Sequence, residues 1–393
     1  MNQNIEFIPF ARPSLGMEEE EAVLRVIRSG WLTTGSETKR FEEEFAAYCG
    51  VPYALAVNSA TAGLHLALEA LGIGPGDWVI TTPYTFTATA AVIIHLGAHP
   101  FFVDIERDSF NLCVEKIQDR LKHNQSKKRI RGLLPVHIGG HPCKMEVFRT
   151  LAKQYDLFLV EDAAHAFPSR TSLGFIGSLG NAGVFSFYAT KTITTGEGGM
   201  VITSQKKIAK RISLMRLHGI DREVWNRYTS ATASWKYWVK EAGFKYNLTD
   251  LASALGRIQL KKAEEFLKKR QSIAYTYTLA FKDRDYLQLP PDAEGHAWHL
   301  YLLRLNLRKL KLSRDAFIQK LQALGIGTSV HFIPLHIHPY WRKVYGFKPT
   351  DFPEAWRKYR EVISLPLYPS LTEDQVHRII QAVLQIGDAH YKP

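Results

Sequence analysis

Cysteine is scarce in this chain. Cys49, Cys113 and Cys143 stand far apart among 393 residues and show no CxxC spacing, so neither a disulfide framework nor a cysteine-based zinc site is predicted. The lack of a disulfide framework is typical of a reducing compartment, and we expect a cytoplasmic protein. Apolar residues make up 46% of the chain, an ordinary globular composition that argues against a disordered or collagen-like protein.

A membrane-spanning segment is not predicted either. Residues 78–103 contain no Lys, Arg, Asp or Glu, but they include Pro83, Pro100 and five threonines. We therefore interpret them as a buried strand, a loop and a helix. Near the N-terminus, Glu6 and Arg12 lie where a secretory signal peptide would have a basic start followed by an unbroken apolar stretch, so secretion is not expected.

Acidic residues are outnumbered by basic ones. The chain has 38 Asp and Glu against 50 Lys and Arg, which gives a formal net charge of +12. Surplus lysine on solvated helix faces explains most of this charge, although the same field would draw in an anionic small molecule or acidic lipid. No zinc-finger or RNA-binding motif is present, so we do not expect nucleic acid as a partner.

The hydrophobic pattern predicts an α/β fold. Short apolar runs alternate with helical patterns up to about residue 250, which is typical of a mostly parallel sheet with crossover helices. After Thr249 we expect one long amphipathic helix, about residues 250–281, then a strand at 300–305 and a helix at 313–324. These elements predict a large α/β domain over residues 1–255 and a smaller α+β domain over residues 256–393, joined by the long helix. The seven strands expected in the large domain are residues 53–57, 79–82, 100–103, 132–136, 157–161, 184–187 and 200–203.

The segment NSATAG, residues 58–63, lies between a predicted strand and a predicted helix. Its small residues let the backbone approach a ligand closely, and the free amides at a helix N-terminus favour an anion such as phosphate. A plain Ser or Thr cap of the helix is the alternative, and it is the commoner meaning of such a segment taken alone.

A second motif, VEDAAH at residues 160–165, ends the strand predicted at 157–161. Asp162 falls just past the C-terminal end of that strand, where open α/β sheets bind their ligands. A buried carboxylate at this point needs a cationic partner; the alternative is a carboxylate that caps the following helix. Taken alone, His165 is more often a satisfied buried histidine than a catalyst.

A third motif, FSFYATK at residues 185–191, runs into TTGEGG at residues 194–199. Lys191 therefore lies between an apolar strand and a glycine-rich loop, where burial would lower its pKa and make it a nucleophilic amine. A lysine on a surface loop is the alternative for this segment taken alone.

In this order, the three motifs resemble the fold-type I pyridoxal-phosphate enzymes, and in detail the DegT/DnrJ/EryC1/StrS sugar aminotransferase family. Within that family the chain is most similar to UDP-4-amino-4-deoxy-L-arabinose aminotransferases, through EDAAHA, HAWHLY and GIGTSVHF. It departs from them at Phe86 and Tyr188, where they carry tryptophan and histidine. Further matching segments extend the resemblance over nearly the whole chain, at residues 29–35, 216–219, 243–250, 330–336 and 364–369.

The resemblance implies three catalytic residues. Lys191 would hold pyridoxal 5′-phosphate as a Schiff base and move a proton between the substrate carbon and the cofactor. Asp162 would keep the ring nitrogen of the cofactor protonated, and His165 would lie beside the ring. The other cofactor-binding residues implied by the resemblance are Ala60, Thr61 and Ser186 at the phosphate, Phe86 stacked on the ring, and Asn247.

Asn247 matches a residue that relatives contribute to the phosphate site of the neighbouring subunit, which implies a homodimer with shared active sites. His331 matches a histidine of the sugar site. Trp31, Arg216 and His336 are further candidates for the substrate pocket, and each has a structural role as its alternative. No metal site is expected.

The implied reaction moves an amino group from an amino acid, with glutamate the first choice, to a keto group of a nucleotide-linked sugar, in two half-reactions. A C4 keto group on a UDP-sugar is favoured, for cell-surface polysaccharide or lipid A type glycan synthesis, ahead of C3 amination of a dTDP-linked sugar. Three other functions are less favoured. Sugar dehydratases with this cofactor typically carry histidine in place of Lys191. A regulatory protein that only senses the cofactor or the sugar would be expected to lack Asp162 or Lys191. A nicotinamide-dependent oxidoreductase is less favoured because GIGPG at residues 72–76 precedes a strand, whereas a dinucleotide-binding motif follows one.

Overall fold

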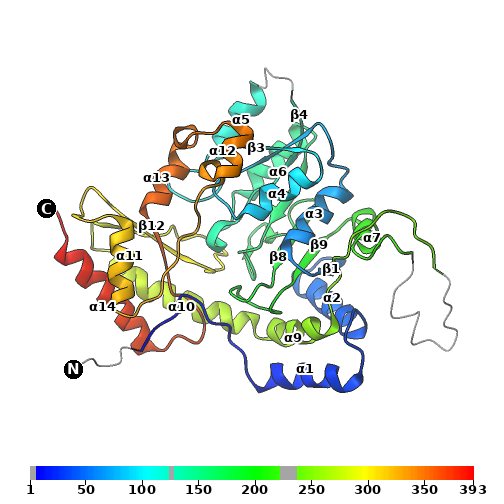
Figure 1. Ribbon diagram of the computed structural model, residues 1–393, viewed down its shortest axis with the longest axis horizontal. Coiled ribbons are helices and arrows are strands. Elements are labelled where there is room, and N and C mark those ends of the chain that lie inside the picture. The colour runs from blue at the N-terminus through cyan, green and yellow to red at the C-terminus, as the bar shows by residue number, and fades with distance from the viewer. Residues whose placement is uncertain (1–5, 124–127, 222–236) are drawn as a thin grey trace.

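A seven-stranded sheet forms the centre of the larger part of the molecule. Figure 1 shows the computed structural model, which describes residues 6–123, 128–221 and 237–393. The strand order is β1-β9-β8-β5-β4-β2-β3. Strand β9 is antiparallel to both of its neighbours, and the other adjacent pairs are parallel. The strands are Tyr53–Val57 (β1), Asp77–Thr81 (β2), His99–Phe102 (β3), Arg129–Leu133 (β4), Phe158–Asp162 (β5), Ala182–Ser186 (β8) and Gly199–Thr203 (β9).

The predictions of a mostly parallel sheet and of its seven strands are confirmed, with strand ends displaced by at most three residues. Glycine-rich residues 72–76 form a turn between α3 (Ala60–Ala70) and β2, as expected. The three cysteines are free and buried. Among the residues that the structure describes, no helix combines the length and the apolar character needed to cross a membrane.

Helices cover both faces of this sheet, because successive side chains of a strand point to opposite faces. On β8, Val184 packs in the core beneath α3, whereas Phe185 packs in the core beneath α2. The helices on the first face are α3, α4 (Thr87–His95) and α7 (Lys206–Met215). Those on the second face are α2 (Ser36–Cys49), α5 (Val114–Lys122) and α6 (Met145–Gln154).

A smaller antiparallel sheet lies in the C-terminal part, in the order β10-β11-β12. Its strands are Leu287–Gln288 (β10), Tyr301–Leu305 (β11) and Val362–Leu365 (β12), and it packs with α11 (Arg314–Ala323) and α14 (Glu373–Ala389). Ile8 near the N-terminus belongs to the same core, and its amide donates to the Gly325 carbonyl at 2.8 Å. The domain division at residues 255 and 256 stays a prediction.

The remaining elements are mostly short. A two-stranded hairpin joins Arg170–Thr171 (β6) and Gly174–Phe175 (β7). Among the described residues, three single-turn 3₁₀ helices span Ile138–Gly140 (η1), Leu335–Ile337 (η2) and Pro349–Asp351 (η3). Further α-helices are Met17–Ser29 (α1), Pro339–Tyr345 (α12) and Pro353–Glu361 (α13).

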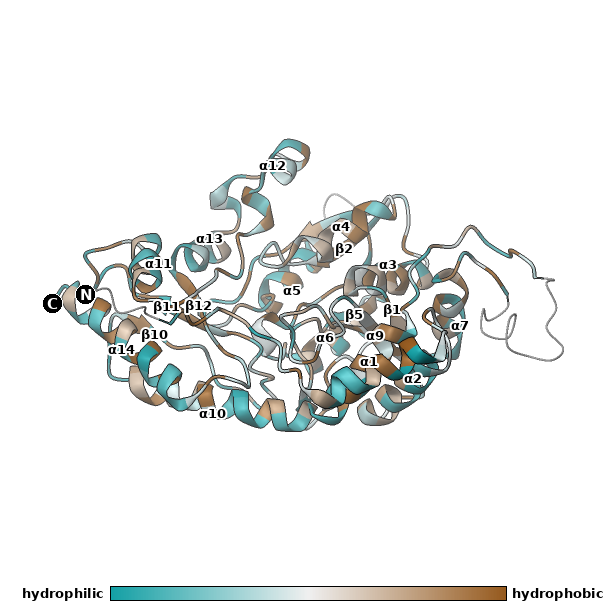
Figure 2. Cartoon of the chain, turned by 60° about the horizontal axis from the view of Figure 1, so that its bottom comes forward, coloured by the Kyte–Doolittle hydropathy of each residue, from teal (hydrophilic) through white to brown (hydrophobic). Residues whose placement is uncertain are grey.

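The expectation of one uninterrupted helix over residues 250–281 is wrong. Helix α9 spans Asp250–Lys261 and α10 spans Ala263–Phe281. Between them, Lys262 has φ −91° and ψ −2°, well away from the helical ψ of about −42°. Figure 2 shows α10 with both hydrophilic and hydrophobic residues along its length. The sequence pattern misses this break because a single non-helical residue hardly changes the period of the apolar positions.

Contacts with α1 hold the end of α9. Figure 1 shows α1 directly below α9. The Lys262 ammonium contacts the two carboxylate oxygens of Glu19 at 2.8 and 2.9 Å. The Gln259 amide also donates to Glu19, at 2.9 Å. These contacts link the N-terminal helix to the segment that connects the two sheets.

Asp250 at the start of α9 supplies the cap that α2 lacks. Its carboxylate accepts hydrogen bonds from the amides of Gly35 and Thr38 at 2.7 and 2.9 Å, and from the Thr38 hydroxyl at 2.7 Å. Asp250 is buried. The first amides of a helix have no intrahelical acceptor, so a residue more than 200 positions away in the sequence satisfies them.

Replacing this carboxylate should destabilise the fold. In Asp250→Ala, several buried donors lose their acceptor, and we expect the free energy of unfolding to fall by about 3 kcal/mol, measured by urea titration. The matched control is Asp374→Ala, which removes an exposed carboxylate from the first turn of α14 and should change that free energy by less than about 0.5 kcal/mol. Equal effects of the two substitutions would contradict the assignment of Asp250 as a buried cap.

Candidate active site

A cavity of about 580 Å³ lies where β5 and β8 end and α3 begins. Strands β1, β5 and β8 run in the same direction, so their C-terminal ends meet at one edge of the sheet. This edge is where open α/β sheets bind ligands. Eight of the residues predicted from the sequence line the cavity: Ala60, Thr61, Phe86, Asp162, His165, Ser186, Lys191 and His331.

One end of the cavity is suited to an anion. Helix α3 begins at Ala60, and the Ser59 hydroxyl caps it by accepting from the Ala62 amide at 3.1 Å. The amides of Ala60 and Thr61 lie in the first turn of this helix, where there is no intrahelical acceptor and the helix dipole is positive. Ser186 lines the same end of the cavity from β8.

Gly199 lets β9 approach the start of α3 closely. A Cβ atom at this position would lie 2.7 Å from the Ala60 nitrogen and 2.8 Å from the Phe185 carbonyl oxygen. Both of these are backbone atoms, which have no free rotation by which to move away. The close packing of β9 against the start of α3 therefore requires glycine at position 199, the last residue of TTGEGG.

Asp162 is a buried carboxylate that forms no ion pair with the described residues. The Thr89 hydroxyl donates to its Oδ2 at 2.8 Å, and the Ala164 amide donates to its Oδ1 at 3.2 Å. Burial raises the pKa of the Asp162 carboxyl, while these two donors and Lys191 act in the opposite direction. A cationic group in the cavity would supply the charge that this carboxylate needs.

Glu161, the residue before Asp162, holds the end of β5 from the other face of the sheet. Its carboxylate accepts hydrogen bonds from the amides of Gly177, Leu179 and Gly180, at 2.7 to 2.8 Å. His137 lies 3.2 Å from the same carboxylate. Glu161 is not among the site residues predicted from the sequence, yet its contacts fix the strand on which Asp162 lies.

Lys191 lies on the loop between β8 and β9 and faces the cavity. Burial lowers the pKa of Lys191 to about 8, and the Asp162 carboxylate acts against this shift. Because of this lowered pKa, a fraction of Lys191 is a neutral amine, and a nucleophile, near neutral pH. The loop is held in place because the Thr195 amide and the Thr194 hydroxyl donate to the Phe187 carbonyl at 2.9 and 3.0 Å.

Three histidines surround the far side of the cavity. His165 and His331 are predicted site residues, whereas His299 was not singled out. The His299 ring centroid lies 4.5 Å from that of His165, and its Nδ1 has no hydrogen-bond partner among the described residues. Burial and the nearby Lys191 lower the pKa of all three rings. His299 is part of HAWHLY, but nothing in the sequence of that segment indicates a contact with His165.

Aromatic side chains complete the wall. Phe86 is 60% exposed, and its ring centroid lies 6.2 Å from that of Phe332. Phe332 in turn stacks on His165 at 5.7 Å. Phe332 thus links Phe86 to His165 along one aromatic wall of the cavity. Tyr188 also lines the cavity. It is one of the two positions at which the chain differs from the UDP-4-amino-4-deoxy-L-arabinose aminotransferases that it resembles.

Four predicted residues lie outside this cavity. Asn247 and Arg216 line another hollow of about 800 Å³, and Arg216 pairs there with Glu42. The Trp31 indole donates to the Thr34 carbonyl at 3.2 Å. His336 is buried against Phe352, with ring centroids 4.9 Å apart. Because the resemblance assigns Asn247 to a neighbouring subunit, its position here does not conflict with that assignment.

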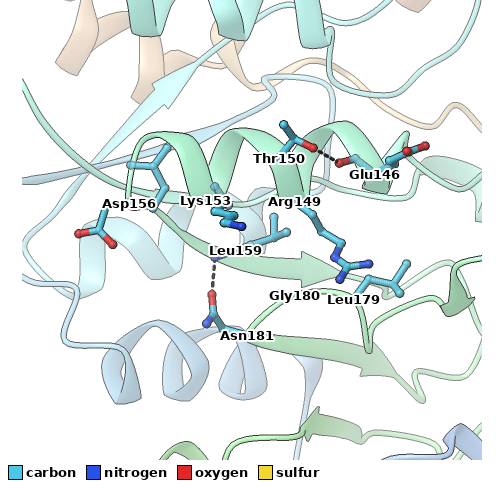
Figure 3. A pocket seen from close by; sticks show the side chains of 11 residues that line it. Glu146, Arg149, Thr150, Lys153, Asp156, Leu159, Leu179, Gly180 and Asn181 are labelled. Atoms are coloured by element: carbon cyan, nitrogen blue, oxygen red, sulfur yellow. Dashed lines mark hydrogen bonds between the residues drawn. The ribbon is translucent and has the colours of Figure 1, made fainter.

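A further hollow lies between α6 and residues 179–181, and Figure 3 shows the side chains that line it. Arg149 and Lys153 are exposed at its rim, and the Asn181 side chain is engaged by the Leu159 amide at 2.7 Å. No predicted functional residue lines it. The described residues also contain no group of three or more His, Cys, Asp or Glu suited to a metal ion.

A family model matches residues 13–384, and its description is the DegT/DnrJ/EryC1/StrS aminotransferase family. The chain belongs to this family. The spore coat polysaccharide biosynthesis protein SpsC of Bacillus subtilis is 45% identical over 383 residues, 97% of either chain. Among solved structures, Helicobacter pylori PseC, an aminotransferase involved in pseudoaminic acid biosynthesis, has a TM-score of 0.89 at 30% identity, covering 98% of this chain and 100% of that chain.

Spr1654 of Streptococcus pneumoniae, solved in its PMP form, also has a TM-score of 0.89 at 30% identity, with 97% of this chain and 99% of that chain covered. The same protein has been solved in its PLP form. Pyridoxal 5′-phosphate is the cofactor of the aminotransferase family to which the chain belongs. The cavity fits this group, because it combines free helix amides, an unpaired buried carboxylate and a lysine of lowered pKa.

The lowered pKa of Lys191 predicts when the residue becomes reactive. Since the neutral amine is the nucleophile, covalent uptake of pyridoxal 5′-phosphate by cofactor-free protein should rise with pH and level off above about 8. An ordinary exposed lysine would reach this plateau above about 10.4. Stopped-flow absorbance at a series of pH values measures the midpoint.

A charge-removing variant tests the cause. The Asp162 carboxylate raises the pKa of Lys191, so Asp162→Asn should move the midpoint to lower pH. If Asp162→Asn has the same midpoint as the unchanged protein, the two side chains do not share this environment. The same conclusion follows if the midpoint of the unchanged protein is close to the pKa of an exposed lysine.

Proposed function

We propose that this protein transfers an amino group from an amino acid, with glutamate the first choice, to a keto group of a nucleotide-linked sugar. The meeting of Lys191, Asp162 and the start of α3 in one cavity carries this proposal. SpsC belongs to spore coat polysaccharide biosynthesis and PseC to pseudoaminic acid biosynthesis, and both roles support a sugar as acceptor. The net charge of +12 suits an anionic, diphosphate-bearing sugar.

When bound, pyridoxal 5′-phosphate would carry the amino group between the two substrates and accept the electrons released at the reacting carbon. Lys191 would anchor it and would move a proton between that carbon and the cofactor. Asp162, held by Thr89 and the Ala164 amide, would place a negative charge opposite the ring nitrogen. Phe86 and His165 would enclose the ring, and Ser186 with the first amides of α3 would bind the phosphate.

We also propose a homodimer with shared active sites. Asn247 lines a hollow separate from the cavity that holds Lys191, which supports a role for Asn247 in the active site of the neighbouring subunit. Buried, free thiols at all three cysteines suit a reducing compartment, and we place the enzyme in the cytoplasm.

Neutralising Asp162 should impair chemistry more than cofactor binding. In Asp162→Asn, we expect single-turnover reaction with glutamate to slow on the order of 100-fold, because the charge that stabilises the protonated ring is lost. The affinity for pyridoxal 5′-phosphate should change far less, since the phosphate contacts remain. Asp156→Asn is the control, because Asp156 is exposed and has φ 51°, which asparagine also tolerates. Full activity of Asp162→Asn would contradict the role.

The acceptor can be identified directly. We would convert the enzyme to its pyridoxamine-phosphate form and mix it with UDP-, dTDP- and GDP-linked ketosugars, following the return of the aldehyde absorbance. A C4 keto group on a UDP-sugar should react fastest, with C3 of a dTDP-sugar as the competing outcome. If no ketosugar reacts while amino acids convert the enzyme readily, the protein is an amino-acid transaminase instead.

A further inference from the structure

His331, the proposed sugar-site histidine, is held by three neighbours on different segments. Phe10 stacks on its ring with centroids 5.3 Å apart and an interplanar angle of 29°. The Tyr84 hydroxyl donates to the His331 carbonyl at 2.7 Å. The third neighbour is Ser364, whose Oγ lies 2.8 Å from His331 Nδ1. Because Nδ1 is engaged by Ser364, Nε2 is the ring nitrogen left for a ligand in the cavity.

Ser364 is itself fixed in position. It lies on β12 and is fully buried. Its amide donates to the Ser329 carbonyl at 2.8 Å, and the Ser329 amide donates to its carbonyl at 3.2 Å. Among the described residues, the Ser364 hydroxyl has one hydrogen-bond partner, His331 Nδ1.

This single partner decides which atom donates. A hydroxyl group carries one proton, and a buried proton without an acceptor is costly. If Nδ1 carried the ring proton and donated it to Oγ, the Ser364 hydroxyl proton would have no acceptor. If Ser364 donates to Nδ1, both groups are satisfied. In a neutral ring the remaining proton then sits on Nε2.

The ring is neutral near pH 7. Burial lowers the pKa of His331 to about 4, and the like charge of Lys191 adds to this effect. A charged His331 would in turn disfavour the charged form of Lys191. A neutral N–H group therefore offers a donor at this wall of the cavity without adding a positive charge.

His165 shows the same arrangement. The Gly139 amide donates to His165 Nδ1 at 3.2 Å, which leaves the proton of this buried ring on Nε2 as well. Two histidines on different segments thus carry their ring proton on Nε2. In each ring, Nδ1 accepts a hydrogen bond, from the Gly139 amide in His165 and from the Ser364 hydroxyl in His331. The cavity is therefore arranged to bind oxygen acceptors.

We propose that Ser364 is a positioning residue that fixes His331 as the Nε2–H tautomer, so that His331 donates a hydrogen bond to a carbonyl or hydroxyl oxygen of the acceptor substrate. The identity of that oxygen as part of a sugar rests on the proposed function. The tautomer itself follows from the contacts of Ser364 and His331 alone.

The decisive measurement is ¹⁵N NMR of the cofactor-loaded enzyme with labelled histidine. The His331 signals are assigned by their loss in His331→Asn. We expect one protonated nitrogen, Nε2, and one unprotonated nitrogen, Nδ1, in the unchanged protein, and a mixture of the two tautomers in Ser364→Ala. A proton on Nδ1 in the unchanged protein, or an unaltered His331 spectrum in Ser364→Ala, would overturn the inference.

Kinetics separate positioning from a general structural effect. In Ser364→Ala, the ketosugar half-reaction should slow about 10-fold or more, whereas the glutamate half-reaction should stay within about two-fold. The control is Ser329→Ala, which removes a neighbouring hydroxyl that makes no side-chain hydrogen bond to His331 and should leave both half-reactions unchanged. Equal slowing of both half-reactions in Ser364→Ala would contradict a specific positioning role.

The two proposals can fail separately. If no ketosugar is aminated but the NMR spectra are as expected, the sugar assignment is wrong and the tautomer assignment stands. If a ketosugar is aminated but Ser364→Ala leaves the spectrum and both half-reactions unchanged, the function stands and the role of Ser364 is refuted.

Discussion

The electrostatic coupling of Lys191 and Asp162 inside one cavity is the constraint on which the rest of the site depends. Burial alone would suppress the charge of both side chains, raising the pKa of the carboxyl and lowering that of the amine. Each partially offsets the shift of the other. A pyridine ring nitrogen placed beside Asp162 would add the cationic partner that the carboxylate lacks, and Lys191 is then free to act as an amine.

The sheet topology creates this coupling. Asp162 and Ser186 end adjacent parallel strands, and the start of α3 follows β1, which runs in the same direction. A large share of the surrounding structure serves to hold these ends in place. Glu161 ties β5 to residues 177–180, and Gly199 allows β9 to pass within contact distance of the α3 amides. The C-terminal part contributes the opposite wall through His299 and His331.

The histidines give this wall a consistent chemistry. His165 and His299 are buried and His331 is partly buried, and all three lie near Lys191, so each has a lowered pKa and adds no competing positive charge. In His165 and His331, Nδ1 accepts a hydrogen bond, so the ring proton lies on Nε2. A cavity built in this way is suited to an anion at the start of α3 and to neutral oxygen acceptors at the histidines.

Much of the fold and the core of the site could be predicted from the sequence. The alternation of apolar runs gave the seven strands, since burial of a strand requires a local pattern. VEDAAH and FSFYATK carry their chemistry within a few residues, so Asp162 and Lys191 could be named from them, whereas Ala60, Thr61 and Ser186 were named through the family resemblance. All five line one cavity. The break at Lys262 could not be seen, because a one-residue interruption leaves the apolar period almost intact.

Residue type and local spacing determined the strands and the chemistry at their ends, because both are recorded within short segments. Only the tertiary structure decided which distant side chains meet. It joined Ser364 to His331 and brought His299 against His165, while it placed Arg216 and His336 elsewhere. These pairings depend on how segments far apart in the sequence pack together, and such long-range packing leaves no periodic trace in the sequence.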